Sequence, residues 1–314
     1  MARTVTITGG SGFVGQLLRR GLAAEGHEIR VFDPYRGILV DLLRRRRLAH
    51  AGSRPGRYAA RVIRAGQVQA EAGLRRTRLI RRGPDDICSD REALAARFRG
   101  SDSVIHLAGI PHPHWPGATE EDFVRLNYDA AVNVFEAARD AGVPVFVFAS
   151  SAQVYLINRP VRIDGFPILE TNHCPTRAEG QTAYGFFKRE VERYLEEACA
   201  AGGTKAVALR LECPGVRSRT ASNFYVSTSV ENTVAAFARA IEADLPGGFG
   251  AFNVADAEVD PAIADVQLFL RERWPHVPNY TKGNEGLLGT EKARRILGYA
   301  PVRGGTYHDL AVLW

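Results

Sequence analysis

The chain has 314 residues, of which 45% are hydrophobic and 24% are charged, and this balance excludes a disordered or fibrous protein. No apolar run approaches the roughly 20 residues that cross a bilayer, and the first predicted strand leaves no room for a secretion signal. Four cysteines are scattered without metal-ligand or disulfide-framework spacing, as is typical of a reducing compartment. We therefore expect a cytoplasmic protein with no membrane partner.

A glycine-rich turn near the N-terminus is the first motif. An apolar strand runs into three glycines spaced by three, Gly9, Gly12 and Gly15, and a helix is predicted over 13–25. Glycines let the backbone approach a pyrophosphate, whose charge then lies at the N-terminus of the helix. A second strand ends at Asp33, about twenty residues further on, where a carboxylate accepts hydrogen bonds from an adenosine ribose. The spacing predicts a dinucleotide site that prefers NAD, with NADP left open by the arginines that follow.

Residues 37–83 are predicted to be an arginine-rich insertion after the second strand. The formal charge of the chain is +6, but residues 36–82 hold fourteen arginines against two acidic residues, so the rest of the chain sums to −6. Leucines at helical spacing predict a pair of helices. Arginine forks bind phosphate and carboxylate, so one interpretation is a lid over an anionic ligand. Few aromatic residues are interleaved for stacking on bases, and we do not expect a nucleic-acid partner. A solvated or oligomer-facing insertion is the alternative, because the chain uses four lysines against thirty-seven arginines.

The rest of the chain alternates strands with helices. This alternation predicts an α/β fold, a doubly wound parallel sheet of the Rossmann type. After residue 213 the pattern loosens into loops and short helices, one of them over 230–243. We therefore predict a dinucleotide-binding domain over 1–213, which includes the insertion, and a small substrate-binding lobe over 214–314. The predicted strands cover 103–107, 143–148 and 206–211, and the predicted helices cover 91–98, 120–141 and 183–201.

Three polar residues form a candidate catalytic group. Tyr184 and Lys188 are four residues apart at the start of a predicted helix, so they lie on one face. An ammonium beside a phenol favours the phenolate and brings its pKa toward neutral, which gives a general acid or base for a substrate hydroxyl. Ser151 follows a neighbouring strand and can hydrogen-bond the same substrate oxygen. Their order after the glycine turn indicates a hydride-transfer site.

Together these features resemble the extended short-chain dehydrogenase/reductase family, also called the NAD-dependent epimerase/dehydratase family. The resemblance rests on TGGSGFVG at the start, HLAG at 106–109, SSAQVY at 150–155, YGFFK at 184–188 and LRLECPG at 209–215. It implies that Ser151, Tyr184 and Lys188 are the catalytic triad and that Lys188 also holds the nicotinamide ribose. It also implies pyrophosphate at the glycines, adenosine ribose at Asp33 and adenine at Asp86 and Ile87. The full implied cofactor site is Gly9, Gly12, Phe13, Val14, Gly15, Asp33, Asp86, Ile87, Leu107, Ala108, Gly109, Tyr184 and Lys188.

Two features depart from the members that act on nucleotide sugars. Those members usually have an asparagine and a tyrosine-glycine-proline turn after the arginine of the LRL strand, where this chain reads Glu-Cys-Pro-Gly at 212–215. The stretch from Arg217 to the helix at residue 230 is also short. In these features the chain resembles the small family members that oxidise free uronic acids or reduce small carbonyl compounds. With a uronic acid, Arg217 and Arg219 would hold the carboxylate; the alternative is that both arginines are solvated.

The loop after HLAG contains His112, His114 and Trp115. A His-x-His pair can chelate a metal, but the surrounding prolines favour an extended loop and no third ligand is evident, so we expect no metal site. The position of this loop makes its residues, and His112 in particular, candidates for the substrate pocket.

The predicted function is an NAD(P)-dependent oxidoreductase that transfers a hydride between nicotinamide and a hydroxyl or carbonyl of its substrate. The alternative is a sugar epimerase or dehydratase that returns the hydride to the same molecule. A dinucleotide sensor or an arginine-rich binding module without chemistry is a third hypothesis.

The helices over 120–141 and 183–201 each carry an apolar stripe. In the resembling family these helices form a four-helix bundle between two subunits, so we expect a homodimer. The competing interpretation is that each stripe only covers its own sheet.

Overall fold

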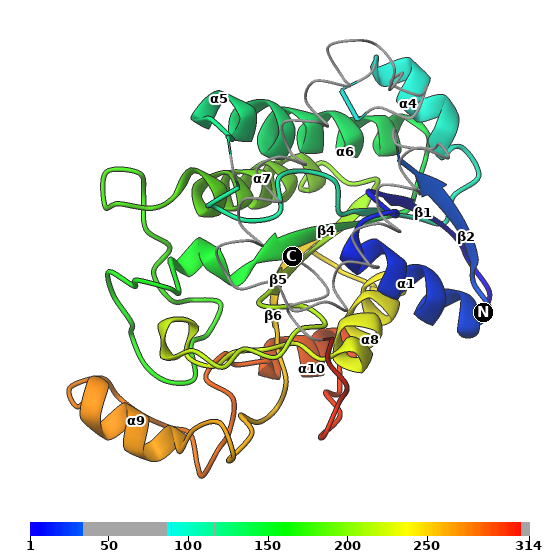
Figure 1. The fold of residues 1–314 in the computed structure, drawn as a ribbon. Helices are drawn as coiled ribbons and strands as arrows, with labels where there is room; N and C mark the ends of the chain where they lie inside the picture. Colours follow the sequence, from blue (N-terminus) through cyan, green and yellow to red (C-terminus); the bar gives the residue numbers. More distant parts are fainter. Residues whose placement is uncertain (34–86, 89, 116, 309–314) are drawn as a thin grey trace, which may run out of the picture.

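The computed structural model describes residues 1–33, 87–88, 90–115 and 117–308. Six strands form one parallel sheet in the order β2-β1-β3-β4-β5-β6 (Figure 1). The predicted doubly wound α/β fold is therefore confirmed, whereas the predicted insertion over 37–83 lies outside the described residues. The strands are β1 (Thr4–Thr8), β2 (Glu28–Phe32), β3 (Ser103–His106), β4 (Val145–Ser151), β5 (Lys205–Leu211) and β6 (Phe249–Val254).

Helices cover both faces of the sheet (Figure 1). On one face, Leu18 and Phe237 pack against apolar side chains of β1 and β5. On the other face, Phe98, Phe135 and Leu195 pack around Phe146 of β4. The central strands are apolar on both sides because both faces are covered, as in other parallel sheets. The first face carries α1 (Phe13–Ala24), α8 (Val230–Ala240) and α10 (Glu291–Leu297), and the second carries α4 (Arg91–Phe98), α6 (Ala130–Asp140) and α7 (Ala183–Cys199).

The direction of winding reverses between β1 and β3. The chain leaves β1 to form β2 on one side and later returns to form β3 on the other side, where Thr8 lies opposite His106. The connections that follow β1 and β3 therefore diverge at the carboxyl ends of these strands. Open α/β sheets bind ligands in the crevice that such a reversal creates.

The helix predicted over 120–141 changes its winding along its length. It begins as α5 (Glu120–Phe123), passes through a π-helical turn, η1 (Val124–Asp129), and continues as α6. A capping box between Thr119 and Asp122 fixes its N-terminus. A π turn accommodates one extra residue and often occurs at functional sites. Here it carries Asn127, which is buried and hydrogen-bonded to the loop after β3.

The C-terminal part contributes both to the sheet and to a separate lobe. The lobe core joins residues of 152–168 to residues of 224–288, and α9 (Val266–Arg273) covers it. The sequence analysis placed all of 214–314 in the lobe, but β6 pairs with β5, and α8 and α10 cover the sheet. A short strand that is buried on both faces has no alternating pattern, so periodicity did not reveal β6. The role of the lobe in substrate binding stays a prediction.

No helix in the described ranges is both long and apolar enough to cross a membrane. Among the same residues, no group of three or more histidine, cysteine, aspartate or glutamate side chains is arranged to hold a metal ion.

Candidate active site

The glycine turn lies against the loop that follows β3. Gly9 has a φ of +70°, and a Cβ at this position would come within 2.9 Å of the backbone nitrogen of Ala108. Only glycine combines this backbone conformation with this close approach. Gly15 lies inside α1 and packs against Gly10. The turn after β1 and the loop after β3 thus meet at the winding reversal.

The N-terminus of α1 is suited to an anion. Its N-cap is Gly12, which is exposed and has no side chain to satisfy the first backbone N–H groups of the helix. Unsatisfied N–H groups and the positive end of the helix dipole attract phosphate. Phe13 and Val14 follow and are half-buried, with the Phe13 ring edge-on to His308 at 5.5 Å between ring centroids.

Asp33 lies beside the same turn, at the carboxyl end of β2. Its side chain is buried, and its carboxylate accepts a hydrogen bond of 3.1 Å from the backbone N–H of Ser11. A carboxylate at this position is suited to the hydroxyls of an adenosine ribose. The glycine cradle, the uncapped helix N-terminus and Asp33 therefore fit a dinucleotide. Asp86, the predicted adenine contact, lies outside the described residues, while Ile87 is buried and its carbonyl accepts a bond from Asn133.

Asn127 holds the loop after β3 in place. Its side chain accepts from the N–H of Ile110 at 2.8 Å and donates to the carbonyl of the same residue at 3.0 Å. Gly109 has a φ of +137° and lies directly against this amide. The backbone N–H of Leu107 donates to the carbonyl of Thr8 and so continues the pairing of β3 with β1. The predicted cofactor-facing residues 107–109 thus form one wall of the crevice.

Ser151 is placed by the end of β4. It is the N-cap of the short helix η2 (Ala152–Tyr155), and its hydroxyl accepts the N–H of Gln153 at 3.2 Å. The Tyr184 phenol, near the start of α7, lies close enough to the Ser151 hydroxyl for that hydroxyl to lower the pKa of the phenol. Both side chains are buried. The structure therefore brings together the two hydroxyls that the sequence placed on separate elements.

Lys188 lies one helical turn after Tyr184 on the same face. Its Nζ donates to the carbonyl of Ala149 at 2.7 Å, and it lies 4.5 Å from the centroid of the Phe148 ring and 5.7 Å from that of Tyr184. Burial lowers the pKa of Lys188 to about 8. The sequence predicted a lowered phenol pKa, but burial raises the pKa of Tyr184 above its ordinary value, against the opposing effect of the Ser151 hydroxyl. The phenol described here is therefore protonated at neutral pH.

Gly185 brings α7 close to the end of β4, a role that the motif alone did not indicate. A Cβ on Gly185 would lie 2.4 Å from the carbonyl oxygen of Gln153 and 2.6 Å from Oε1 of Gln181. Gln181 in turn donates to the carbonyls of Gln153 and Val154, both at 3.0 Å. This contact sets the distance between Tyr184 and Ser151.

Besides Ser151, the predicted substrate residues are His112 and Arg217, and these two occupy different surroundings. His112 is half-buried, and its ring lies edge-on to Trp115 with 5.5 Å between centroids. Trp115 packs on the small apolar cluster that includes Tyr184, so this loop borders the catalytic group. Arg217 is ion-paired with Asp260 and lies over the Tyr307 ring at 4.2 Å. A role for either residue in substrate binding stays a prediction.

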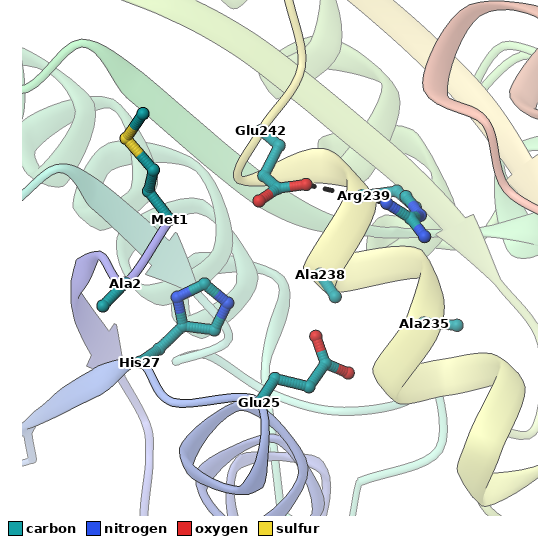
Figure 2. A pocket seen from close by; sticks show the side chains of 8 residues that line it. All are labelled: Met1, Ala2, Glu25, His27, Ala235, Ala238, Arg239 and Glu242. Atoms are coloured by element: carbon teal, nitrogen blue, oxygen red, sulfur yellow. Dashed lines mark ion pairs between the residues drawn. The ribbon is translucent and has the colours of Figure 1, made fainter.

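A pocket of about 370 Å³ lies at the opposite edge of the sheet (Figure 2). It is bordered by Met1 and Ala2, which precede β1, and by residues of α8, where Arg239 pairs with Glu242. Ligands of open α/β sheets bind at the carboxyl ends of the strands, so this pocket is not the candidate active site.

The fold and the site define an NAD-binding enzyme of the Rossmann type. The profile of the NAD dependent epimerase/dehydratase family matches residues 5–245. The chain belongs to this family, which confirms the predicted class, an NAD-dependent dehydrogenase or epimerase of the extended short-chain dehydrogenase type.

Individual relatives are more distant. Human sterol-4-alpha-carboxylate 3-dehydrogenase, decarboxylating, is 29% identical over 154 residues, which make up 49% of this chain and only 30% of that relative. The structure of a mutated uronate dehydrogenase superposes with a TM-score of 0.59 at 18% identity and covers 96% of this chain and 82% of that one. A UDP-galactose 4-epimerase structure gives a TM-score of 0.57 at 21% identity, with 99% and 96% covered. At these identities the structural likeness bears on the fold.

Proposed function

We propose that the protein is an NAD(P)-dependent oxidoreductase that transfers a hydride between nicotinamide and a hydroxyl or carbonyl of a small polar or sugar-like substrate. The observation that carries the proposal is the juxtaposition of the buried Ser151 and Tyr184 side chains, with Lys188 5.7 Å from the centroid of the Tyr184 ring on the same face of α7. This group lies at the carboxyl ends of the strands, the edge of the sheet that also carries the glycine turn. The position is that expected for a substrate beside a bound nicotinamide.

Ser151 and Tyr184 would hold the reacting oxygen of the substrate between their hydroxyl groups. The protonated Tyr184 is suited to donate its proton to a carbonyl oxygen in the reductive direction. In the oxidative direction Tyr184 would first lose its own proton to solvent, and the phenolate would then take the proton of the substrate hydroxyl. The Lys188 ammonium, which is the main form below about pH 8, favours this phenolate. NAD, when bound, supplies the hydride acceptor.

The main alternative is an epimerase or dehydratase, in which the hydride returns to the substrate. Epimerases among the structural neighbours support this alternative, while the sterol dehydrogenase relative and the uronate dehydrogenase neighbour support a dehydrogenase. The Glu-Cys-Pro-Gly sequence at 212–215, in place of the usual nucleotide-sugar turn, also favours a small free substrate.

A substrate panel tests the proposal. Purified protein is incubated with alcohols, aldoses, uronates and sugar nucleotides, each with NAD and with NADP, while reduced nicotinamide is followed by its absorbance and the products by chromatography. Net reduction of the cofactor with a small polar substrate is the expected result. A change in substrate stereochemistry without net reduced nicotinamide would establish the epimerase alternative instead.

We further propose that the protein is a cytoplasmic homodimer. The outer side of α7 carries the half-buried rings of Phe186 and Phe187, and Tyr128 of η1 lies 6.1 Å from Phe187. Phe187 packs on the small cluster around Tyr184, and Tyr128 packs at the edge of the core beneath α6 and α7. All three rings stay partly exposed. A second subunit would bury them in a twofold-symmetric contact.

A further inference from the structure

Glu212 is a buried acidic residue at the catalytic edge of the sheet. It follows β5 directly, and the last residue of that strand, Leu211, lies opposite Ser151 in the register of β4 and β5. Its side chain is only 8% exposed. It is coupled electrostatically to the Tyr184 phenol, whose pKa it raises. The mechanism proposed above assigns it no role.

The partners of Glu212 are all neutral. Gln153 Nε2 lies 3.3 and 3.5 Å from its two oxygens, Asn223 Nδ2 lies at 3.3 Å, and the Cys213 thiol lies at 3.7 Å. Within the described residues, no cationic side chain is ion-paired with it. Burying a carboxylate without a cation costs several kcal/mol unless other groups solvate it. Burial accordingly raises the pKa of Glu212.

A second buried glutamate in the same region is paired in the usual way. Glu192 of α7 accepts two bonds from Arg210, at 2.6 and 2.9 Å, a third from Arg189 at 3.2 Å and a fourth from Ser150 at 2.6 Å. Its contacts are short and charge-assisted, as expected for a structural ion pair. Glu212 has only long contacts from neutral donors. The fold therefore provides the Glu192 carboxylate with four hydrogen-bond donors of the protein and leaves the Glu212 carboxylate with unused acceptor positions.

The unused capacity is adjacent to the catalytic hydroxyls. An ionised carboxylate offers about four acceptor positions, and Oε2 of Glu212 receives one described contact, from Gln153 at 3.3 Å. The backbone N–H of Gln153 is in turn held by the Ser151 hydroxyl. A substrate oxygen held between Ser151 and Tyr184 would therefore lie beside Gln153, the residue that links Ser151 to Glu212.

We propose that Glu212 determines substrate specificity by accepting a hydrogen bond from a donor group of the substrate, a hydroxyl or an ammonium, next to the reacting carbon. The same carboxylate repels a substrate whose own carboxylate or phosphate would lie at that position. This inference rests on the proposed function and deepens it, because it selects neutral and amino sugars or polyols over uronates. A purely structural role, in which Glu212 tethers Gln153 and Asn223, is the competing explanation.

The test measures binding and turnover with three sugars that differ in charge: D-glucose, D-glucosamine and D-glucuronate. Affinities for protein saturated with NAD are measured by calorimetry, and kcat/KM by cofactor reduction. Wild-type protein is expected to favour glucose or glucosamine over glucuronate by at least about tenfold. Glu212→Gln retains the size of the side chain and an acceptor oxygen but removes the charge. We expect its kcat/KM for the neutral or amino sugar, divided by that for glucuronate, to be about tenfold lower than in wild type, with unchanged affinity for NAD.

Asn223→Ala is the matched control, because it removes one tether of Glu212 and keeps the charge. It is expected to leave this ratio of kcat/KM values within about twofold of wild type. An equal shift in both variants would show a structural role and overturn the inference. If Glu212→Gln fails to fold, the order of kcat/KM values of the wild-type protein for the three sugars decides whether the inference holds. If the protein turns over glucuronate alone, the inference is overturned and the proposed function stays intact. If none of the three sugars binds, both the inference and the proposed sugar-like substrate class are refuted.

Discussion

The close approach of α7 to the end of β4 makes a specific prediction for Gly185→Ala. The new Cβ would lie 2.4 Å from the Gln153 carbonyl oxygen and 2.6 Å from Gln181 Oε1. An ordinary contact begins near 3.4 Å, so α7 or the loop after β4 must move by about 1 Å. Misplacement of a catalytic group by about 1 Å can lower the rate about 100-fold. We therefore expect kcat/KM to fall by roughly two orders of magnitude.

The same substitution has a small expected effect on stability. Alanine is favoured over glycine inside a helix by about 1 kcal/mol, whereas the forced contact costs about 1 to 3 kcal/mol. The net loss is therefore about 0 to 2 kcal/mol, which a urea titration measures. Gly247→Ala is the control, since Gly247 has no heavy atom within 4 Å of an added Cβ. Full activity of Gly185→Ala would refute the argument that this contact sets the distance between Tyr184 and Ser151.

Three further predictions concern pH, cofactor choice and assembly. Burial lowers the pKa of His106 to about 3, below its value of 6.5 when unfolded, so its contribution to stability is present above pH 6.5 and is lost as the pH falls toward 3. Between pH 7 and pH 4.5, urea titrations are expected to show that the free energy of unfolding falls by about 2.5 kcal/mol more for wild type than for His106→Asn. An equal fall in both proteins would contradict this. Asp33→Ser is expected to raise the affinity for NADP relative to NAD about tenfold by calorimetry, because the carboxylate repels a 2′-phosphate; tighter binding of NADP by wild type would refute the assignment of Asp33. Light scattering at micromolar concentration is expected to give about twice the chain mass of 34.4 kDa, whereas a mass near one chain would leave α6 and α7 with a role in their own core only.

The sequence predicted the parts of the site that local motifs define. The glycine turn, Asp33, Ser151 and the pair Tyr184 and Lys188 each follow a strand or open a helix, so chain order and strand direction already place them at one edge of a parallel sheet. The structure brings the buried side chains of Tyr184 and Ser151 together, as the order of these motifs suggested.

The features that the sequence did not predict depend on contacts between distant segments. Glu212 meets Gln153 from 59 positions away, and Gly185 meets the loop after β4, so neither environment is visible in a local pattern. The predicted direction of the shift in the Tyr184 pKa was also wrong, because burial of the phenol raises its pKa and outweighs the lowering effect of Ser151.

The central claim is that Tyr184 transfers the proton, and Tyr184→Phe tests it most directly. The variant loses the phenolic hydroxyl and keeps the ring that packs against Phe123. With the best substrate of the panel, we expect kcat to fall by at least about 100-fold, while calorimetry shows that the variant still binds NAD. A variant that reduces NAD at the wild-type rate would contradict the account.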